Sequence, residues 1–134
     1  MSLRWYTTVV DSPDPRALAD WWAQALGWQK IYDTEDEVVL IPGYATPELI
    51  AEMPWERVPP GLVFVKVPDG VKTVKNRVHI DLAPHTSDDR DAEIARLKAL
   101  GATEVDVGQG ADVTWTVLAD PQGNEFCVLS SRDS

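Results

Sequence analysis

The sequence predicts an α+β fold made of two similar units, each a strand, a helix and further strands. Two internal repeats indicate this duplication. The segment from Arg16 to Gly27 recurs from Arg90 to Gly101, 74 positions further along, as an arginine that opens an amphipathic run ending in Leu-Gly. The second repeat, Gly61-Leu62-Val63-Phe64 and Gly123-Asn124-Glu125-Phe126, has a spacing of 62 positions. Because repeated sequence reflects repeated structure, we expect any binding site to form where the two copies meet.

Size and composition are those of one ordinary domain. The chain has 134 residues, 44% of them apolar, which is enough to bury a substantial core. No apolar run approaches the roughly 20 residues that cross a bilayer, and the segment 1–4 lacks the apolar stretch of a signal peptide. Cys127 is the single cysteine, so no intrachain disulfide forms, which suits the cytoplasm. The net charge of −10 argues against nucleic acid and anionic membranes as partners.

The elements of the first unit follow from local signals. Residues 3–10 are rich in aromatic and β-branched side chains and predict a strand. Asp14 is positioned to cap a helix, and Pro15 to occupy its first position, where the missing N–H costs nothing. Apolar residues then recur with helical spacing as far as Gly27, which fits a left-handed helix stop. The remaining strands of this unit are expected at 28–32, 38–41 and 62–67.

A proline-rich segment, residues 42–60, interrupts the first unit. The repeat interval is 34 positions in the first unit (27 to 61) and 22 in the second (101 to 123), so 12 extra residues lie before Gly61. We expect mostly loop there, with room for one turn of helix. Tyr44 and Trp55 give this loop side chains that suit ligand binding, since long loops over a scaffold often carry specificity. Packing of the same side chains onto the core is an equally open alternative.

The second unit follows a turn at Pro68-Asp69-Gly70 and opens with a strand at residues 77–83. Ser87-Asp88-Asp89 is expected to cap the next helix, with acids near its start, where the helix dipole favours them. The buried stripe of that helix is Ile94, Leu97 and Leu100. Further strands are expected at 103–107, 113–118 and 125–129, with a turn at 120–124 before the last.

Polar side chains are expected on the sheet face that no helix covers. Alternation along the first strand of this unit puts Val78, Ile80 and Leu82 towards the helix, and Arg77, His79 and Asp81 on the open face. On the last strand, Phe126 and Val128 would face the helix, and Glu125, Cys127 and Leu129 the open face. A neutral imidazole and a carboxylate are a common partial ligand set for divalent metals, so His79 and Glu125 predict such a site if their strands are neighbours. An ordinary hydrogen-bonded pair is the alternative, and Cys127 is interpreted as inert packing.

These residues resemble a known family. The turn and strand Asp120-Pro121-Gln122-Gly123-Asn124-Glu125-Phe126, the strand Asn76-Arg77-Val78-His79-Ile80-Asp81-Leu82 and the helix end Ala25-Leu26-Gly27-Trp28 are similar to the glyoxalase/bleomycin resistance/dioxygenase superfamily, also called vicinal oxygen chelate proteins. The likeness is greatest to its glyoxalase-like branch. It implies two βαβββ modules in tandem, residues 3–67 and 76–130, within a single domain. Their sheets would form a curved mixed sheet with a concave cup, often in a homodimer.

The resemblance also implies a divalent metal, held by one ligand from the first strand and one from the last strand of each module. His79 and Glu125 match these positions in the second module. In the first module the repeat offset puts Trp5 opposite His79, or Thr7 after a slip of two residues, and Val63 opposite Glu125. None of these three is a good metal ligand, so half of the implied set is missing, and Asp81 is the best substitute.

The leading hypothesis is therefore a small organic molecule bound in the cup without a full metal site. Its apolar lining would be Trp5, Thr7, Val63, Val65 and Trp115, and its polar groups Arg77, His79, Asp81 and Glu125. The alternative is a metal-dependent lyase, isomerase or dioxygenase, with His79 and Glu125 as ligands and Glu125 or Asp81 shuttling a proton. A binding or regulatory domain without turnover is a third alternative. The cofactor and the identity of the ligand stay open at this point.

Overall fold

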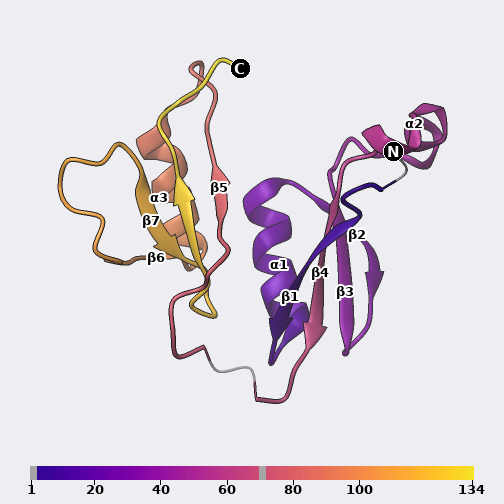
Figure 1. Cartoon of the computed structure of the whole chain (residues 1–134), viewed down its shortest axis with the longest axis horizontal. Helices are drawn as coiled ribbons and strands as arrows, with labels where there is room; N and C mark the ends of the chain where they lie inside the picture. The colour runs from indigo at the N-terminus through magenta and orange to yellow at the C-terminus, as the bar shows by residue number, and fades with distance from the viewer. Residues whose placement is uncertain (1–2, 70–71) are drawn as a thin grey trace. The chain divides into compact units, whose positions relative to one another are not determined.

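The computed structural model describes residues 3–69 and 72–134, and the chain forms two compact units, Met1–Val71 and Lys72–Ser134 (Figure 1). The first contains β1 (Thr7–Ser12), α1 (Pro15–Leu26), β2 (Gln29–Asp33), β3 (Glu37–Ile41), α2 (Pro47–Glu52), a 3-10 turn (Trp55–Arg57) and β4 (Gly61–Lys66). The second contains β5 (Ile80–Leu82), α3 (Arg90–Leu100), β6 (Thr103–Glu104), β7 (Thr116–Ala119) and β8 (Glu125–Val128). The last residue of the predicted turn at 68–70 lies outside the described residues.

The two sheets have the same topology. Their strand orders are β1-β4-β3-β2 and β5-β8-β7-β6, so the first and last strands of each unit lie side by side. These two pairs are parallel, whereas the neighbouring pairs are antiparallel. The predicted pair of βαβββ modules is thus confirmed. Within the described residues, no helix has the length and apolar character needed to cross a bilayer.

The helix α1 forms as its sequence signals predict. The Asp14 side chain accepts a hydrogen bond from the backbone N–H of Ala17, Pro15 occupies the first turn, and Gly27 ends the helix with φ of 67°. Its buried residues pack against β3 and β4. The core of this unit comprises Leu18, Trp21, Trp22, Val38, Leu40 and Phe64.

The first strand begins at Thr7, later than the predicted Leu3. Its partner β4 begins at Gly61, which pairs with Thr7, so the preceding residues have no strand to pair with in this sheet. Trp5 and Tyr6 are accordingly exposed, and the Arg4 guanidinium lies 4.1 Å from the centroid of the Trp55 ring.

The proline-rich segment contains more helix than predicted. Thr46 caps α2 by accepting a hydrogen bond from the Leu49 N–H, and Pro47 opens the helix where its missing N–H costs nothing. Tyr44 and Trp55 are 61% and 57% exposed, so they are not packed into a core in this structure. Trp55 instead stacks on Tyr6, with 6.4 Å between ring centroids.

The strand β5 is shorter than the predicted segment 77–83. Pairing with β8 begins at Ile80, opposite Phe126, because β8 itself starts only one residue earlier. Val78 is therefore outside the sheet and 79% exposed, so its predicted position facing the helix is wrong. The predicted cap of α3 is confirmed, since Asp89 accepts a hydrogen bond from the Ala92 N–H at 3.1 Å.

Candidate functional site

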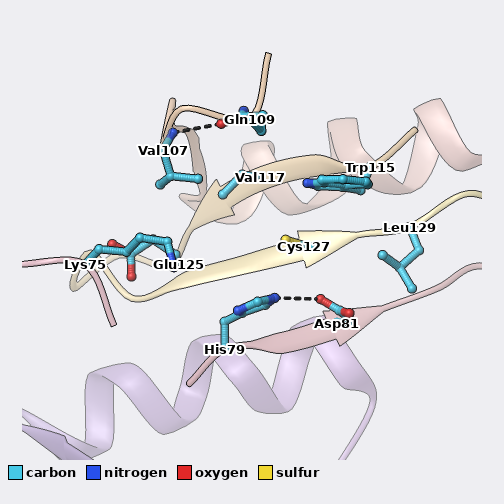
Figure 2. A pocket seen from close by; sticks show the side chains of 10 residues that line it. All are labelled: Lys75, His79, Asp81, Val107, Gln109, Trp115, Val117, Glu125, Cys127 and Leu129. Carbon is cyan, nitrogen blue, oxygen red and sulfur yellow. Dashed lines mark hydrogen bonds and ion pairs between the residues drawn. The ribbon is translucent and has the colours of Figure 1, made fainter. Parts of the chain in front are cut away.

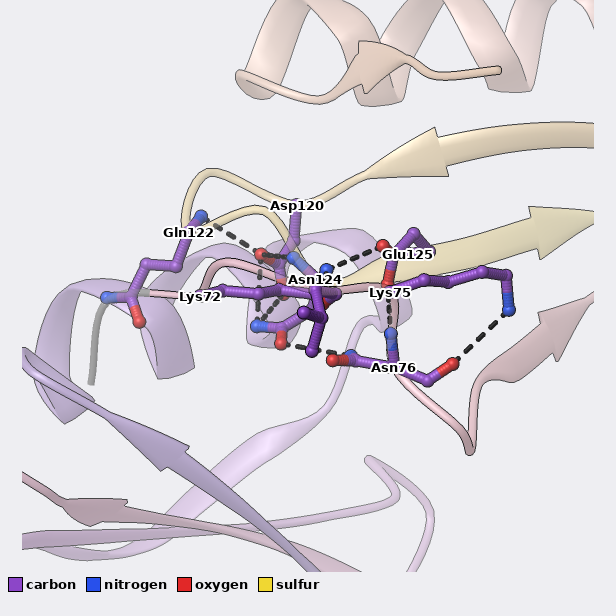
Figure 3. Close-up of polar contacts among 8 residues, drawn as sticks. Lys72, Lys75, Asn76, Asp120, Gln122, Asn124 and Glu125 are labelled. Carbon is purple, nitrogen blue, oxygen red and sulfur yellow. Dashed lines mark hydrogen bonds and ion pairs between the residues drawn. The ribbon is translucent and has the colours of Figure 1, made fainter. Parts of the chain in front are cut away.

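The turn before β8 is built by the Asp120 side chain, which is 3% exposed. Its Oδ1 accepts hydrogen bonds from the backbone N–H groups of Gln122 at 2.9 Å and Asn124 at 3.0 Å (Figure 3). Gly123 has φ of 89°, in the left-handed region that favours glycine. The Asp-Pro-x-Gly-Asn sequence therefore has a local structural role, which is to fix where Glu125 enters the strand.

The carboxylate of Glu125 is held by groups of its own unit. Lys72 Nζ lies 2.5 Å from Oε1, and the Asn76 backbone N–H donates to Oε2 at 3.1 Å. The Asn76 side chain in turn donates to Asn124 Oδ1 at 3.2 Å (Figure 3). Burial alone would raise the pKa of Glu125, but the hydrogen bonds from Lys72 and Asn76 outweigh it and lower the pKa below its ordinary value. Glu125 is therefore an ionised carboxylate whose two oxygens are both engaged.

Three potential ligand side chains lie together beside Glu125. Asp81 and Cys127 are opposite each other in the parallel pair β5–β8, and His79 precedes Asp81 by two residues. His79 Nε2 is 3.1 Å from Asp81 Oδ1, and one donor atom from each of the three side chains lies within 4.8 Å of the others (Figure 2). Burial, followed by the negative charge of Asp81, raises the pKa of the Cys127 thiol.

A pocket of about 330 Å³ opens over this group (Figure 2). Most of its lining residues lie on β7, on β8 or in the loop before β7. The exposed surface of the lining is largely apolar, with a few polar groups. Its lining residues are Lys75, His79, Asp81, Val107, Gln109, Trp115, Val117, Glu125, Cys127 and Leu129. All of them belong to the second unit.

Four of the predicted site residues line this pocket: His79, Asp81, Trp115 and Glu125. Arg77 is exposed and is not among the lining residues. The other four predicted residues belong to the first unit and do not line this pocket. Trp5 is 70% exposed and donates its ring N–H to the Thr7 carbonyl, Val63 is buried, and Thr7 and Val65 are half-buried.

The strand registers correct the repeat offset. Val10 pairs with Phe64 and Ile80 pairs with Phe126, so the first strands of the two units correspond at an offset of 70. The helices correspond at 74, the offset of their C-terminal glycines, Gly27 and Gly101. The connection between strand and helix is therefore four residues longer in the second unit. The offset of 74 taken from the sequence repeat is therefore correct for the helices but not for the first strands.

This correction changes the counterpart of His79. The predicted counterparts were Trp5 or Thr7, whereas the registers put Val9 at that position, still on the same face of the strand. The counterpart of Glu125 is Val63, which pairs directly with Val9. The first unit thus carries two valines where the resemblance implies metal ligands.

The residues present do not fit the implied metal. Two of the four positions are valines, and Glu125 is already bound to Lys72 and Asn76. A metal on Glu125 would have to compete with the Lys72 ammonium. The side chains of Glu125 and Lys72 are only 10% and 17% exposed, so their mutual attraction is strong. We therefore derive no chemistry through a metal held by Glu125.

Sequence reasoning missed several lining residues. Lys75, which lines the pocket, and Lys72, which pairs with Glu125, come from a stretch with no clear period, where a lysine is normally taken as solvated. Gln109 lies between Gly108 and Gly110, in a segment whose sequence is typical of a turn. Cys127 was placed on the correct face, but its position opposite Asp81 depends on the register between two strands that are distant in sequence.

Comparisons with known proteins agree with this fold. The family model described as a glyoxalase-like domain matches residues 7–129. Among curated proteins there is no significant match. A family enzyme of the glyoxalase/bleomycin resistance protein/dioxygenase type from Burkholderia phytofirmans is 16% identical, with a TM-score of 0.69, 97% of this chain and 100% of that chain being covered.

Two further solved structures have ligands. The bleomycin-binding protein of Streptomyces verticillus, in complex with copper(II)-bleomycin, is 15% identical with a TM-score of 0.57 over 98% of this chain and 99% of that chain. The fosfomycin resistance protein FosX of Listeria monocytogenes, a mutant in complex with Mn(II) and a dihydroxypropylphosphonic acid, is 12% identical with a TM-score of 0.66 over 98% and 92%. At these identities the likeness shows the fold. The family match establishes that the chain belongs to the glyoxalase-like domain family, and its fold is that of the glyoxalase/bleomycin resistance/dioxygenase structures.

Proposed function

We propose that this protein binds a small organic molecule in the pocket of its second module, without a metal held by Glu125. The observation that carries the proposal is the engagement of both Glu125 oxygens by Lys72 and the Asn76 N–H. A carboxylate in this state supports the pocket wall, and a cation at Glu125 would have to compete with the Lys72 ammonium. This disfavours Glu125 as the second metal ligand of the module, and we infer that an organic molecule is the occupant of the pocket.

The lining indicates the class of ligand. Trp115, Val117 and Leu129 offer ring and aliphatic surface, which favours a compact molecule with an apolar or aromatic part. The His79–Asp81 pair supplies a hydrogen-bond donor and an acceptor at one end of the pocket. Lys75 adds a cation to the same wall, so a ligand with one polar or anionic group would be oriented by it.

The solved neighbours offer one precedent for each alternative. The bleomycin-binding protein holds a drug complexed to copper(II), and its name describes binding. FosX is a resistance protein crystallised with Mn(II) and a phosphonic acid. We favour the first comparison for this chain for two reasons. Val9 and Val63 lie at two positions where the resemblance implies metal ligands, and Lys72 forms an ion pair with Glu125.

The test is a binding titration on full-length protein freed of metal with a chelator. The probe is the fluorescent aromatic anion 8-anilinonaphthalene-1-sulfonate, with bleomycin and fosfomycin as further ligands. We expect saturable probe binding in the presence of chelator, weakened at least about tenfold by Trp115→Ala, since loss of a stacking ring costs at least about 1.4 kcal/mol. Trp55→Ala is the matched control, because Trp55 is an exposed tryptophan of the first unit.

Two results would contradict the proposal. The first is equal weakening by the two tryptophan substitutions, since binding would then not be specific to the pocket. The second is binding that appears only after Mn²⁺ or Ni²⁺ is added and is lost in both His79→Ala and Glu125→Gln. That outcome would establish the alternative, a metal-dependent lyase, isomerase or dioxygenase, which the presence of His79 and Glu125 in one pocket favours.

We further propose that the chain acts as a homodimer. Val9 and Tyr32 leave apolar surface on the first unit, at 55% and 51% exposure, which a second copy could cover. Native mass spectrometry of the metal-free protein measures the subunit count. A mass of one chain at micromolar concentration would reject the dimer without affecting the binding proposal.

A further inference from the structure

We propose that His79, Asp81 and Cys127 form a binding site for a thiophilic divalent cation of the zinc class, independent of Glu125. The site goes beyond the organic-ligand function, although it lies in the same pocket. It differs from the ligand set implied by the family resemblance, because two of its three ligands, Asp81 and Cys127, are outside that set. The three side chains supply one nitrogen, one oxygen and one sulfur.

The geometry is close to what such a cation requires. Tetrahedral zinc with bonds of about 2.0–2.3 Å holds its ligand atoms about 3.3–3.6 Å apart. His79 Nε2 and Asp81 Oδ1 are already 3.1 Å apart, and the donor atoms of all three residues lie within 4.8 Å of one another. Side-chain rotations of His79 and Asp81, which are 40% and 48% exposed, can close the remaining gap without moving the sheet.

The fold fixes the third ligand. Cys127 is 7% exposed on β8 and directly opposite Asp81 in the β5–β8 register, so both side chains emerge on the same face. His79 lies two residues before Asp81 and therefore shares that face. This arrangement needs only one strand pair, and no residue of the first unit contributes to it.

Charge and ligand type select the cation. A thiolate and a carboxylate together balance a divalent charge, while a neutral imidazole adds a third bond, and the thiol proton is released to solvent on binding. Sulfur and imidazole ligands favour Zn²⁺ or Co²⁺, whereas Mg²⁺ and Mn²⁺ prefer oxygen. Three protein ligands would leave a fourth position for water or a bound molecule.

The test uses the full-length chain without an affinity tag, treated with chelator and then titrated with Zn²⁺ in a competition assay. We expect one Zn²⁺ per chain, bound at least about 100-fold more weakly by His79→Ala and by Cys127→Ser, because losing a ligand costs more than losing its supporting contacts. With Co²⁺, the wild type should show thiolate-to-cobalt charge-transfer absorption, which Cys127→Ser abolishes. Mn²⁺ should compete only weakly.

Two further variants sharpen the result. His85→Ala is the matched control, since His85 is the second histidine, lies in an exposed loop and hydrogen-bonds Ser87. It should leave Zn²⁺ affinity unchanged. Glu125→Gln separates the two metal hypotheses, because it leaves the proposed ligands intact and should retain one Zn²⁺ per chain.

Several results would overturn this inference. One is Zn²⁺ affinity unchanged in both His79→Ala and Cys127→Ser, and another is several weakly bound ions per chain, as expected of an acidic surface. Absence of the cobalt charge-transfer band would exclude Cys127 as a ligand. Because His79 is exposed, His79→Ala keeps the test valid even if the buried Cys127 substitution unfolds the protein. Binding of the aromatic probe to metal-free protein is measured separately. Failure of the zinc proposal and failure of the organic-ligand proposal are therefore distinguished.

Discussion

Lys72 and Glu125 form an ion pair within the second module, with 2.5 Å between Nζ and Oε1, although 53 positions separate them in sequence. Both side chains are largely buried, at 17% and 10% exposure. The pair connects the segment before β5 to the start of β8. The Asn76 N–H donates a second hydrogen bond to the same carboxylate. The pair thereby fixes the position of the Glu125 carboxylate in the pocket wall.

Replacing Lys72 by Met should destabilise the protein by about 2 kcal/mol, because the buried Glu125 carboxylate would lose its counter-ion and a strong hydrogen bond. Chemical denaturation gives the free energy of unfolding. Lys66→Met is the matched control, since the Lys66–Glu35 pair is 37% and 78% exposed and should contribute less than about 1 kcal/mol. Equal effects of the two substitutions would show that the Lys72 pair is an ordinary surface contact.

Replacing Arg90 by Met should cost about 2–4 kcal/mol. Its guanidinium donates to the carbonyls of Leu129 and Val128 and to Thr116 Oγ1, each at 2.9 Å, and so joins α3 to both β7 and β8. Arg96→Met on the same helix is the comparison, because its pair with Glu93 is exposed. If thermal melts of the two variants coincide, the role assigned to Arg90 is wrong.

Replacing Asp120 by Ala should cost about 2–3 kcal/mol, because the turn before β8 would lose its acceptor for the N–H groups of Gln122 and Asn124. The exposed Asp88→Ala should change stability by no more than about 0.5 kcal/mol. Hydrogen exchange should also speed up at Asn124 and Glu125 in the Asp120 variant. Unchanged exchange there would mean that the backbone holds the turn without this side chain.

The pKa of Asp33 should rise in Arg16→Gln. In the wild type the hydrogen bond from Arg16 Nε, at 2.9 Å, lowers the pKa of Asp33 below its ordinary value. The stabilisation it brings is therefore present above about pH 3.9, the ordinary aspartate value, and is lost as the pH falls through the folded pKa. Carboxyl carbon shifts followed by NMR through an acid titration measure this. An unchanged titration midpoint would contradict the assigned pair.

The elements with local signals were predictable from sequence. Asp14 and Asp89 cap their helices as expected, Gly27 ends α1, and the turn at 120–124 forms where its sequence indicates. These features depend on residues a few positions apart. The duplication of a unit of strand, helix and further strands followed from the two repeats, and the βαβββ order followed from the family resemblance.

The remaining features of the fold and of the candidate site depend on contacts between segments that are distant in sequence. Val78 alternates correctly with Ile80, yet it is exposed because β8 is too short to pair with it. The engagement of Glu125 could not be predicted, since Lys72 has no pattern that marks a partner 53 positions away. Cys127 was interpreted as packing because buried cysteines are usually inert, and its position opposite Asp81 depends on the β5–β8 register.

The most direct test of the proposed site is an amide NMR titration of metal-free protein with 8-anilinonaphthalene-1-sulfonate. We predict that the amides of Asp81, Trp115 and Cys127 shift together and saturate at one probe per chain, with chelator present throughout. Shifts that spare these residues, or that appear only once Mn²⁺ is added, would contradict a metal-independent binding pocket in the second module.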